Sequence, residues 1–114
     1  MTRSHAGPPA TIYRGRIYGA VLSERLGEKY YLVVSNNRRN ARLDSVLAIR
    51  LTTSAKPDLD SIVVLNHTDG PWSGRALADD IVEVYRDEIT RELGALRPAT
   101  MRRIDDALRA ALDF

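Results

Sequence analysis

The sequence predicts an α+β domain that is mainly β: a small SH3-like barrel of about six to seven short strands with a C-terminal helix. The first observation is a series of short β-branched and aromatic runs separated by turn residues, which is typical of strands. The second is the stretch 98–114, whose apolar residues recur at helical spacing. The length of 114 residues fits one domain with one core, so we expect residues 12–114 to form a single domain.

The chain begins with a segment that lacks any pattern. Residues 1–11 contain glycine and prolines but no apolar periodicity, and we expect a disordered tail there. The next run, 11–22, is rich in isoleucine, tyrosine and valine and predicts a strand. Gly15 and Gly19 interrupt it, which indicates a bulge or a strong bend, as a small barrel needs.

The stretch 29–53 organises the rest of the chain. Two apolar runs, 29–35 and 45–53, are of about strand length and flank a polar break. If the runs pair antiparallel, the start of the first lies beside the end of the second. Lys29 and Thr52 then lie together at one end of the sheet. A cation beside a hydroxyl on rigid strands suits the binding of a phosphate that gains charge during a reaction.

Other polar residues surround this pair in the sequence. Glu24, in the predicted loop 23–28, is the carboxylate close to it in sequence. The segment 36–42, NNRRNAR, is the densest cluster of donors in the chain. Such groups bind phosphates and the edges of unstacked bases, but the segment fits a polar turn with exposed charges equally well. Of Tyr30 and Tyr31, alternation lets only one face the site.

The second half of the chain is expected to add short strands and the final helix. Residues 66–74 carry strong turn signals and include His67 and the only tryptophan, Trp72. Pro98 suits a first helical position, whereas Arg97 before it is a poor N-cap. The expected elements are strands at 61–65, 75–77, 81–85 and 92–96, a helical turn at 86–90 and a helix at 98–114.

Composition excludes several kinds of site. The net charge is only +2, so a nucleic-acid site must come from local clustering of basic residues. The chain has no cysteine, which excludes disulfides and zinc–thiolate sites. Asp79 and Asp80 lack a third oxygen ligand at suitable spacing, so we expect no metal and no cofactor. No apolar run approaches the roughly 20 residues of a membrane span, and we expect a cytoplasmic protein.

Six segments match, in order, the motifs of one known family. The matching segments are RGRIY at 14–18, SERLGEK at 23–29, LVVSNN at 32–37, IRLTT at 49–53, ALADDI at 76–81 and LGALRPATM at 93–101. Each is weak alone, but their order and spacing span nearly the whole chain from Tyr13. The chain therefore resembles the MazF/PemK/Kid family of toxin endoribonucleases.

The resemblance implies the toxin of a type II toxin–antitoxin system. It implies sequence-specific, metal-independent cleavage of single-stranded RNA by 2′-hydroxyl attack, which leaves a 2′,3′-cyclic phosphate and a 5′-hydroxyl. It also implies a homodimer with RNA in the dimer groove. A cognate MazE-like antitoxin would inhibit it by placing a disordered tail in that groove.

Position by position, the family's catalytic arginine falls on Lys29, its threonine on Thr52 and its loop glutamate on Glu24. Lysine keeps the charge of arginine but loses its bidentate fork. Tyr30 and Arg50 stand where the family usually has prolines. The expected RNA contacts are Arg14, Arg16, Arg25, Asn36, Arg38, Arg39, Arg50, Thr53 and Asp80.

Two alternatives remain open at this point. The departure at Lys29 fits a catalytically weakened relative that only binds RNA or antitoxin. The second alternative is a CcdB-like toxin of the same broad fold that poisons gyrase. That class acts through an aromatic–glycine C-terminal end, whereas this sequence ends in Leu112, Asp113 and Phe114.

Overall fold

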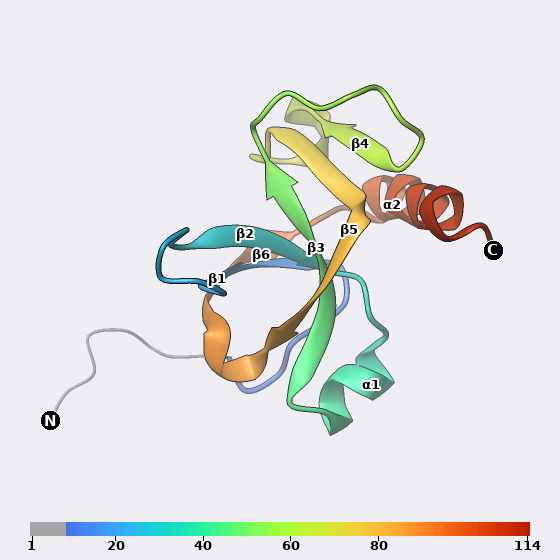
Figure 1. Ribbon diagram of the computed structural model, residues 1–114. Coiled ribbons are helices and arrows are strands. Elements are labelled where there is room, and N and C mark those ends of the chain that lie inside the picture. The colour runs from blue at the N-terminus through green and yellow to red at the C-terminus, as the bar shows by residue number, and fades with distance from the viewer. Residues whose placement is uncertain (1–8) are drawn as a thin grey trace, which may run out of the picture.

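Six strands form a single antiparallel sheet in the order β4-β5-β3-β2-β1-β6 (Figure 1). The structure is a computed structural model and describes residues 9–114. The strands are β1 (Arg16–Ala20), β2 (Lys29–Val33), β3 (Ser45–Thr52), β4 (Ile62–Leu65), β5 (Gly74–Tyr85) and β6 (Ile89–Ala95). The helices are α1 (Asn37–Arg42) and α2 (Pro98–Leu112), with single 3₁₀ turns at His67–Asp69 and Arg86–Glu88. The predicted fold class, α+β and mainly β, is confirmed.

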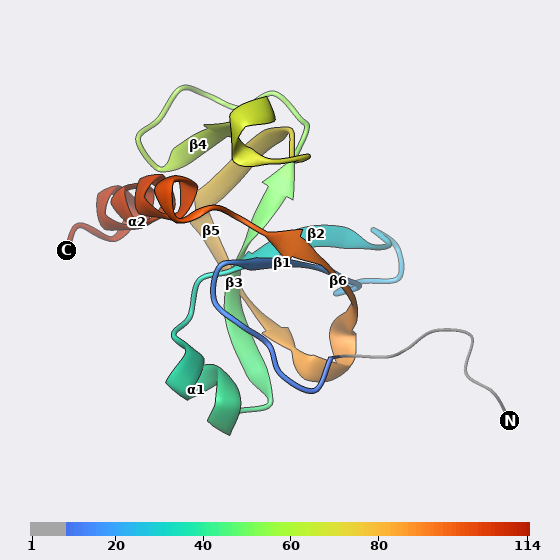
Figure 2. The same cartoon turned by 180° about the vertical axis from the view of Figure 1, so that it is seen from behind.

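The sheet is strongly bent. Figures 1 and 2 show β1, β2 and β6 lying across the long strands β3 and β5, with β4 and α2 at one end and α1 at the other. α2 packs on β5 and β4. The chain reaches α2 directly from β6, so the helix closes one face of the sheet.

Both faces of the sheet are buried. On one face Ile17, Leu32 and Ile49 pack with Ile104 and Leu108 of α2 in one core cluster. The other face forms a second cluster, in which no residue of α2 takes part. Its members are Ile12, Tyr18, Ala20, Tyr31, Val33, Val46, Ala48, Val84 and Ile89. Because this second face is covered by the bent sheet itself, β2 reads as a continuous apolar run rather than an alternating one.

The helix predicted at the C-terminal end is confirmed, and so is the helical turn that follows β5. α2 buries Met101, Ile104 and Leu108, which recur at helical spacing. It begins at Pro98, and Arg97 makes no side-chain capping bond, as expected. The strand predicted at 11–22 is shorter, since only Arg16–Ala20 pairs with neighbours. The last strand begins three residues earlier than predicted, at Ile89.

The polar segment at 36–42 is a helix rather than a turn. The side-chain oxygen of Asn36 accepts a hydrogen bond from the backbone N–H of Arg39 at 2.9 Å and caps α1. Asn40 is buried and hydrogen-bonds with Ser35 through both its side-chain oxygen and nitrogen. Arginine and alanine favour a helix once this cap is present. Reading the segment as a turn gave too little weight to Asn36 as an N-cap.

The two short strands predicted at 75–77 and 81–85 are one strand, β5. Ile81 pairs with Ile49 and Ala76 pairs with Leu51, so residues 77–80 lie opposite Arg50 alone. This irregularity bends β5 without ending it, because Ile62 of β4 pairs with Leu77 on the other side. The two aspartates that suggested a break are exposed residues in this bend.

The predicted N-terminal tail lies mostly outside the described residues, which start at Pro9. The backbone carbonyls of Pro9 and Ala10 accept hydrogen bonds from Arg86 at 3.1 and 3.0 Å. Neither helix within residues 9–114 has the length and apolar character that crossing a membrane requires.

Candidate active site

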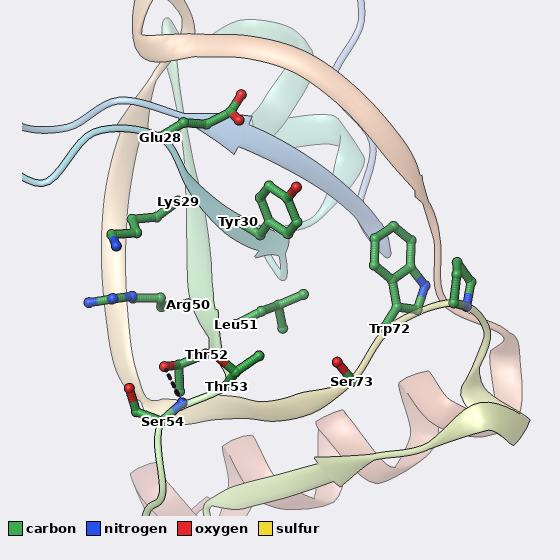
Figure 3. Close-up of a pocket in the computed structure, with 11 residues that line it drawn as sticks. Glu28, Lys29, Tyr30, Arg50, Leu51, Thr52, Thr53, Ser54, Trp72 and Ser73 are labelled. Atoms are coloured by element: carbon green, nitrogen blue, oxygen red, sulfur yellow. Dashed lines mark hydrogen bonds between the residues drawn. The ribbon is translucent and has the colours of Figure 1, made fainter.

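A cavity of about 350 Å³ opens at the end of the β2–β3 pair, where both strands meet the loop before β5 (Figure 3). Tyr30 and Leu51 point toward Trp72, whereas Lys29 and Arg50 point the opposite way. Strand alternation explains this, because neighbouring residues of a strand project to opposite faces. The lining residues are Glu28, Lys29, Tyr30, Arg50, Leu51, Thr52, Thr53, Ser54, Pro71, Trp72 and Ser73.

Lys29 and Thr52 lie together, as the strand-pairing argument predicted. β2 and β3 pair antiparallel with Tyr30 opposite Leu51, and one further step of this register places Lys29 opposite Thr52. Directly opposed residues share a face of the sheet. On the next strand Arg75 pairs with Thr52, a neighbour that the sequence pattern did not single out. Thr52 is thus flanked by a lysine and an arginine across the sheet.

The backbone is closely packed around Thr52. Its hydroxyl oxygen accepts a hydrogen bond from the backbone N–H of Ser54 at 3.1 Å, so its own O–H remains available as a donor. Gly74 has a φ of +87°, and a Cβ there would lie 2.2 Å from the Thr52 carbonyl oxygen. Only glycine allows β5 to begin this close to the end of β3.

Arg50 adds a third cation near Thr52. Because the two residues are two positions apart on β3, they share a face, and Figure 3 shows Arg50 extending in the same direction as Lys29. The Nε atom of Arg50 is buried and has no hydrogen-bond partner. Within residues 9–114 neither Lys29 nor Arg50 forms an ion pair. Both charges are therefore available to an anionic ligand.

Glu28 is the carboxylate that lines the cavity, but it is already engaged. Arg91 binds both of its oxygens at 2.8 and 3.0 Å, and the Thr90 hydroxyl donates at 2.5 Å. The hydrogen bonds from Arg91, and to a smaller extent the one from Thr90, hold the pKa of Glu28 below its usual value. A Cβ at Gly19 would lie 2.4 Å from a Glu28 oxygen, so this glycine makes room for the contact. A carboxylate held this way is a poor proton acceptor.

Tyr30 and Trp72 form the aromatic side of the cavity. Tyr30 is 40% exposed whereas Tyr31 is 7% exposed and part of the core, so the prediction that only one tyrosine faces the site is confirmed. Trp72 is half-buried and packs against the core cluster beneath α2. Sequence reasoning placed Trp72 in a turn without assigning it to the site. Its position in a glycine-rich turn as the only tryptophan was the available signal.

Glu24 and Arg25 do not line this cavity. Both are exposed in the loop between β1 and β2. Asp80 also lies outside it, in the bend of β5. It is close enough to Tyr31 to raise the pKa of that phenol, although burial is the larger cause and Arg50 acts in the opposite direction.

Arg14 and Arg16 serve contacts within the chain. Arg14 donates to the Val34 carbonyl at 2.9 Å and forms an ion pair with Asp105 of α2. Arg16 pairs with Glu92 at 3.0 Å and lies over the Tyr13 ring, 4.6 Å from its centre. Arg14 thus ties the segment before β1 to α2, and Arg16 ties β1 to β6.

The residues predicted around α1 are also apart from the cavity. Asn36 caps the helix, and Arg39 donates to the Ser45 carbonyl at 2.7 Å. Arg38 is exposed. Of the predicted site residues, the cavity therefore gathers Lys29, Thr52, Arg50 and Thr53.

The described residues contain no group of three or more histidine, aspartate or glutamate side chains placed to hold a metal ion. His67 is exposed in the 3₁₀ turn and does not line the cavity.

Comparison with known proteins identifies the family. The sequence model of the PemK-like, MazF-like toxins of type II toxin–antitoxin systems matches residues 13–112. The chain belongs to the PemK/MazF toxin family. This agrees with the resemblance carried by the six sequence motifs.

Curated relatives and solved structures agree with this assignment. The chain is 39% identical over 99 residues to Endoribonuclease MazF4 of Mycobacterium tuberculosis and to Endoribonuclease MazF1 of Mycobacterium bovis, covering 87% of this chain and 90% of each relative. A mycobacterial endoribonuclease solved in complex with its cognate antitoxin is 38% identical, with a TM-score of 0.83 over 91% of this chain and 97% of that one. MazF in a MazE–MazF complex from Deinococcus radiodurans, at 21% identity and a TM-score of 0.74, shares the PemK/MazF fold.

Proposed function

We propose that this chain is the toxin of a type II toxin–antitoxin system and acts as an endoribonuclease on single-stranded RNA. The observation that carries the proposal is the pairing of Lys29 with Thr52 at the mouth of an open cavity in a PemK/MazF chain. Lys29 and Arg50 have no ion-pair partner within residues 9–114, so their positive charges can attract the negatively charged RNA. Cleavage at defined sequences and independence from metal ions are part of the proposal.

The cleavage step needs charge stabilisation and two proton transfers. The ribose 2′-oxygen attacks the adjacent phosphorus and loses its proton, and the bond from phosphorus to the 5′-oxygen breaks. Lys29 neutralises the non-bridging oxygens and protonates the departing 5′-oxygen. Thr52 donates its hydroxyl hydrogen to the same phosphate. The products are a 2′,3′-cyclic phosphate and a 5′-hydroxyl.

Glu24 and Glu28 differ in their fitness to accept the 2′-hydroxyl proton. Glu28 is near the phosphate position but is held by Arg91 and Thr90. Among residues 9–114 Glu24 has no side-chain hydrogen bond, but it lies outside the cavity, so its loop must move toward the cavity for it to take part. We propose that Glu24 accepts the 2′-hydroxyl proton when its loop moves toward the cavity. Without that movement, solvent water accepts the proton. Exchange Glu24→Gln distinguishes the two by its effect on kcat.

The proposed RNA contacts fall into two groups. Arg50 and Thr53 line the cavity and would hold the phosphates beside the reacting one. Arg25 and Arg38 are exposed and would contact the backbone further along the strand. Arg14, Arg16 and Arg39 are engaged in internal bonds, so their contribution to RNA binding would be small.

Assembly and partners follow from the family. We propose a homodimer, an RNA-binding groove shared between its protomers and a cognate MazE-like antitoxin that competes with RNA for the groove. The proposal places the protein in the cytoplasm, with residues 12–114 as one toxin domain. Light scattering at micromolar concentration tests the dimer, and a monomeric mass would contradict the shared groove.

The test of the function is the fate of a long single-stranded RNA incubated with the purified, antitoxin-free protein in EDTA. Mapping of the new ends should give cuts at discrete sequences, each with a 5′-hydroxyl on one product and a cyclic phosphate on the other. RNA that binds but stays intact would instead support a catalytically weakened relative, the reading that Lys29 in place of arginine favours. A protein that ignores RNA and traps a topoisomerase would contradict the proposal entirely.

A further inference from the structure

The cavity has two chemically different sides. Lys29, Arg50 and Thr52 supply charge and a hydroxyl on one side, while Tyr30, Leu51 and Trp72 supply apolar and aromatic surface on the other (Figure 3). We propose that Tyr30 and Trp72 form a stacking subsite for one unpaired RNA base next to the phosphate bound by Lys29 and Thr52. This inference rests on the proposed function and adds to it the place where a base is held.

The strands place the two kinds of surface next to each other. Lys29 and Tyr30 are consecutive on β2, and Arg50 and Leu51 are consecutive on β3. Each cation is therefore followed directly by an apolar residue that projects the other way at the same end of the sheet. A nucleotide joins a charged phosphate to a flat base through a sugar, so it matches this arrangement. A phosphate alone would leave the aromatic side unused.

Trp72 is held in place before any ligand arrives. Its six-membered ring lies against Gly94, where a Cβ would come within 2.9 Å of Cζ2. At the five-membered ring, a Cβ at Gly70 would lie 3.1 Å from the indole nitrogen. Asp69, three residues before Trp72, is fixed by Thr100 and Arg103 of α2 at 2.6 and 3.0 Å. A platform fixed in this way loses little conformational entropy when a base stacks on it.

A tryptophan that only filled space at this position would carry an energetic cost. The Trp72 Nε1 atom is buried and has no hydrogen-bond partner among the described residues. A phenylalanine would fill the gap against the core without leaving a buried donor unpaired. The wide ring is better explained by a task that uses its face, and stacking on bases is such a task.

Tyr30 supports the same reading from the other strand. It is 40% exposed, so its ring is accessible from the cavity rather than needed for the core. The exchange Tyr30→Ala should remove stacking surface and leave the fold in place.

The experiment measures binding without cleavage. The probes are 12-residue oligomers of uridine and of adenosine that carry 2′-O-methyl groups, and a 12-residue ribose-phosphate oligomer of the same backbone without bases. Binding is followed by the fluorescence of Trp72, the only tryptophan in the chain. The variants are Tyr30→Ala and Tyr30→Phe, with Tyr85→Ala as the matched control because Tyr85 is an exposed tyrosine outside this cavity.

We expect the oligomers with bases to quench Trp72 fluorescence and the base-free oligomer to leave it unchanged. Tyr30→Ala should weaken binding of the base-bearing oligomers by about 5- to 100-fold, and Tyr30→Phe and Tyr85→Ala by less than about twofold. Equal binding of the base-free oligomer, no binding of either kind, or an unaffected Tyr30→Ala protein would overturn the subsite. Base-dependent quenching by a protein that leaves long RNA intact would keep the subsite and reject the nuclease function.

Discussion

Replacement of the buried Asp69 by alanine should strongly destabilise the fold. Asp69 is 4% exposed and accepts bonds from the Asn66 N–H at 2.9 Å, the Thr100 hydroxyl at 2.6 Å and Arg103 at 3.0 Å. It therefore joins the turn before Trp72 to the first turns of α2.

The size of the effect follows from these bonds. A hydrogen bond to a charged group contributes about 1.5–3 kcal/mol, and removal of the acceptor leaves its donors unpaired. The three bonds act as one unit and are not additive, so we expect a total loss of about 3–4 kcal/mol. With about 2.1 cal/mol/K of unfolding entropy per residue, this lowers the Tm of a chain of 114 residues by about 12–17 °C.

The pH dependence provides a second check on Asp69. Burial alone would raise the pKa of this carboxyl, but the hydrogen bonds from Thr100, Asn66 and Arg103 outweigh burial and keep the pKa below its usual value. The bonds therefore stabilise the fold above the unfolded pKa of about 4, and this stability is lost as pH falls through the folded pKa. Asp69→Asn should flatten the acid side of the stability curve.

Thermal unfolding by circular dichroism measures both effects. Asp58→Ala is the control, because Asp58 is an exposed aspartate in a loop. The reasoning is refuted if Asp69→Ala lowers the Tm by no more than Asp58→Ala does, or if Asp69→Asn unfolds in acid with the same profile as the unchanged protein.

Three further predictions address the site and its surroundings. Gly74→Ala should lower the free energy of unfolding by about 1–3 kcal/mol, because φ at this position is positive and the added Cβ would meet the Thr52 carbonyl. It should reduce RNA cleavage more than RNA binding, and unchanged cleavage would contradict this. Arg14→Ala should lower the Tm through loss of its ion pair with Asp105, while kcat stays within about twofold. A selective loss of RNA binding would instead indicate that Arg14 contacts RNA. Glu28→Gln should have a lower Tm than the unchanged protein at pH 7, and the two should converge as pH falls through the lowered folded pKa of Glu28, where the stabilisation by the charged carboxylate is lost; an equal difference at all pH values would contradict this.

The pairing of Lys29 with Thr52 could be derived from strand patterns, because antiparallel pairing of two adjacent runs leaves little choice of partner. Trp72 could not be assigned to the same cavity in this way. Its place depends on how the turn at 66–74 folds back, which Asp69 decides through contacts with residues about thirty positions away.

The two loop glutamates show the same limit. Position in the sequence singled out Glu24, whereas the structure brings Glu28 to the cavity, because Gly19 on the neighbouring strand leaves space for its side chain. α1 was missed for a different reason, because the local N-cap Asn36 was not recognised in the polar segment. Long-range contacts, rather than local preference, therefore determine the places of Trp72 and Glu28.

The proposed catalytic role of Lys29 is tested most directly by the single-turnover cleavage rate of a mapped RNA site in EDTA. The protein is compared with its Lys29→Ala, Lys29→Arg and Thr52→Ala variants, and with Arg102→Ala as a control, because Arg102 is an exposed residue of α2 that does not line the cavity. We expect Lys29→Ala to lower the rate by about 10²–10³-fold, as for loss of a donor to a transition-state oxyanion. Thr52→Ala should also slow cleavage strongly, while Lys29→Arg retains activity. Normal cleavage by a folded Lys29→Ala protein would contradict the account.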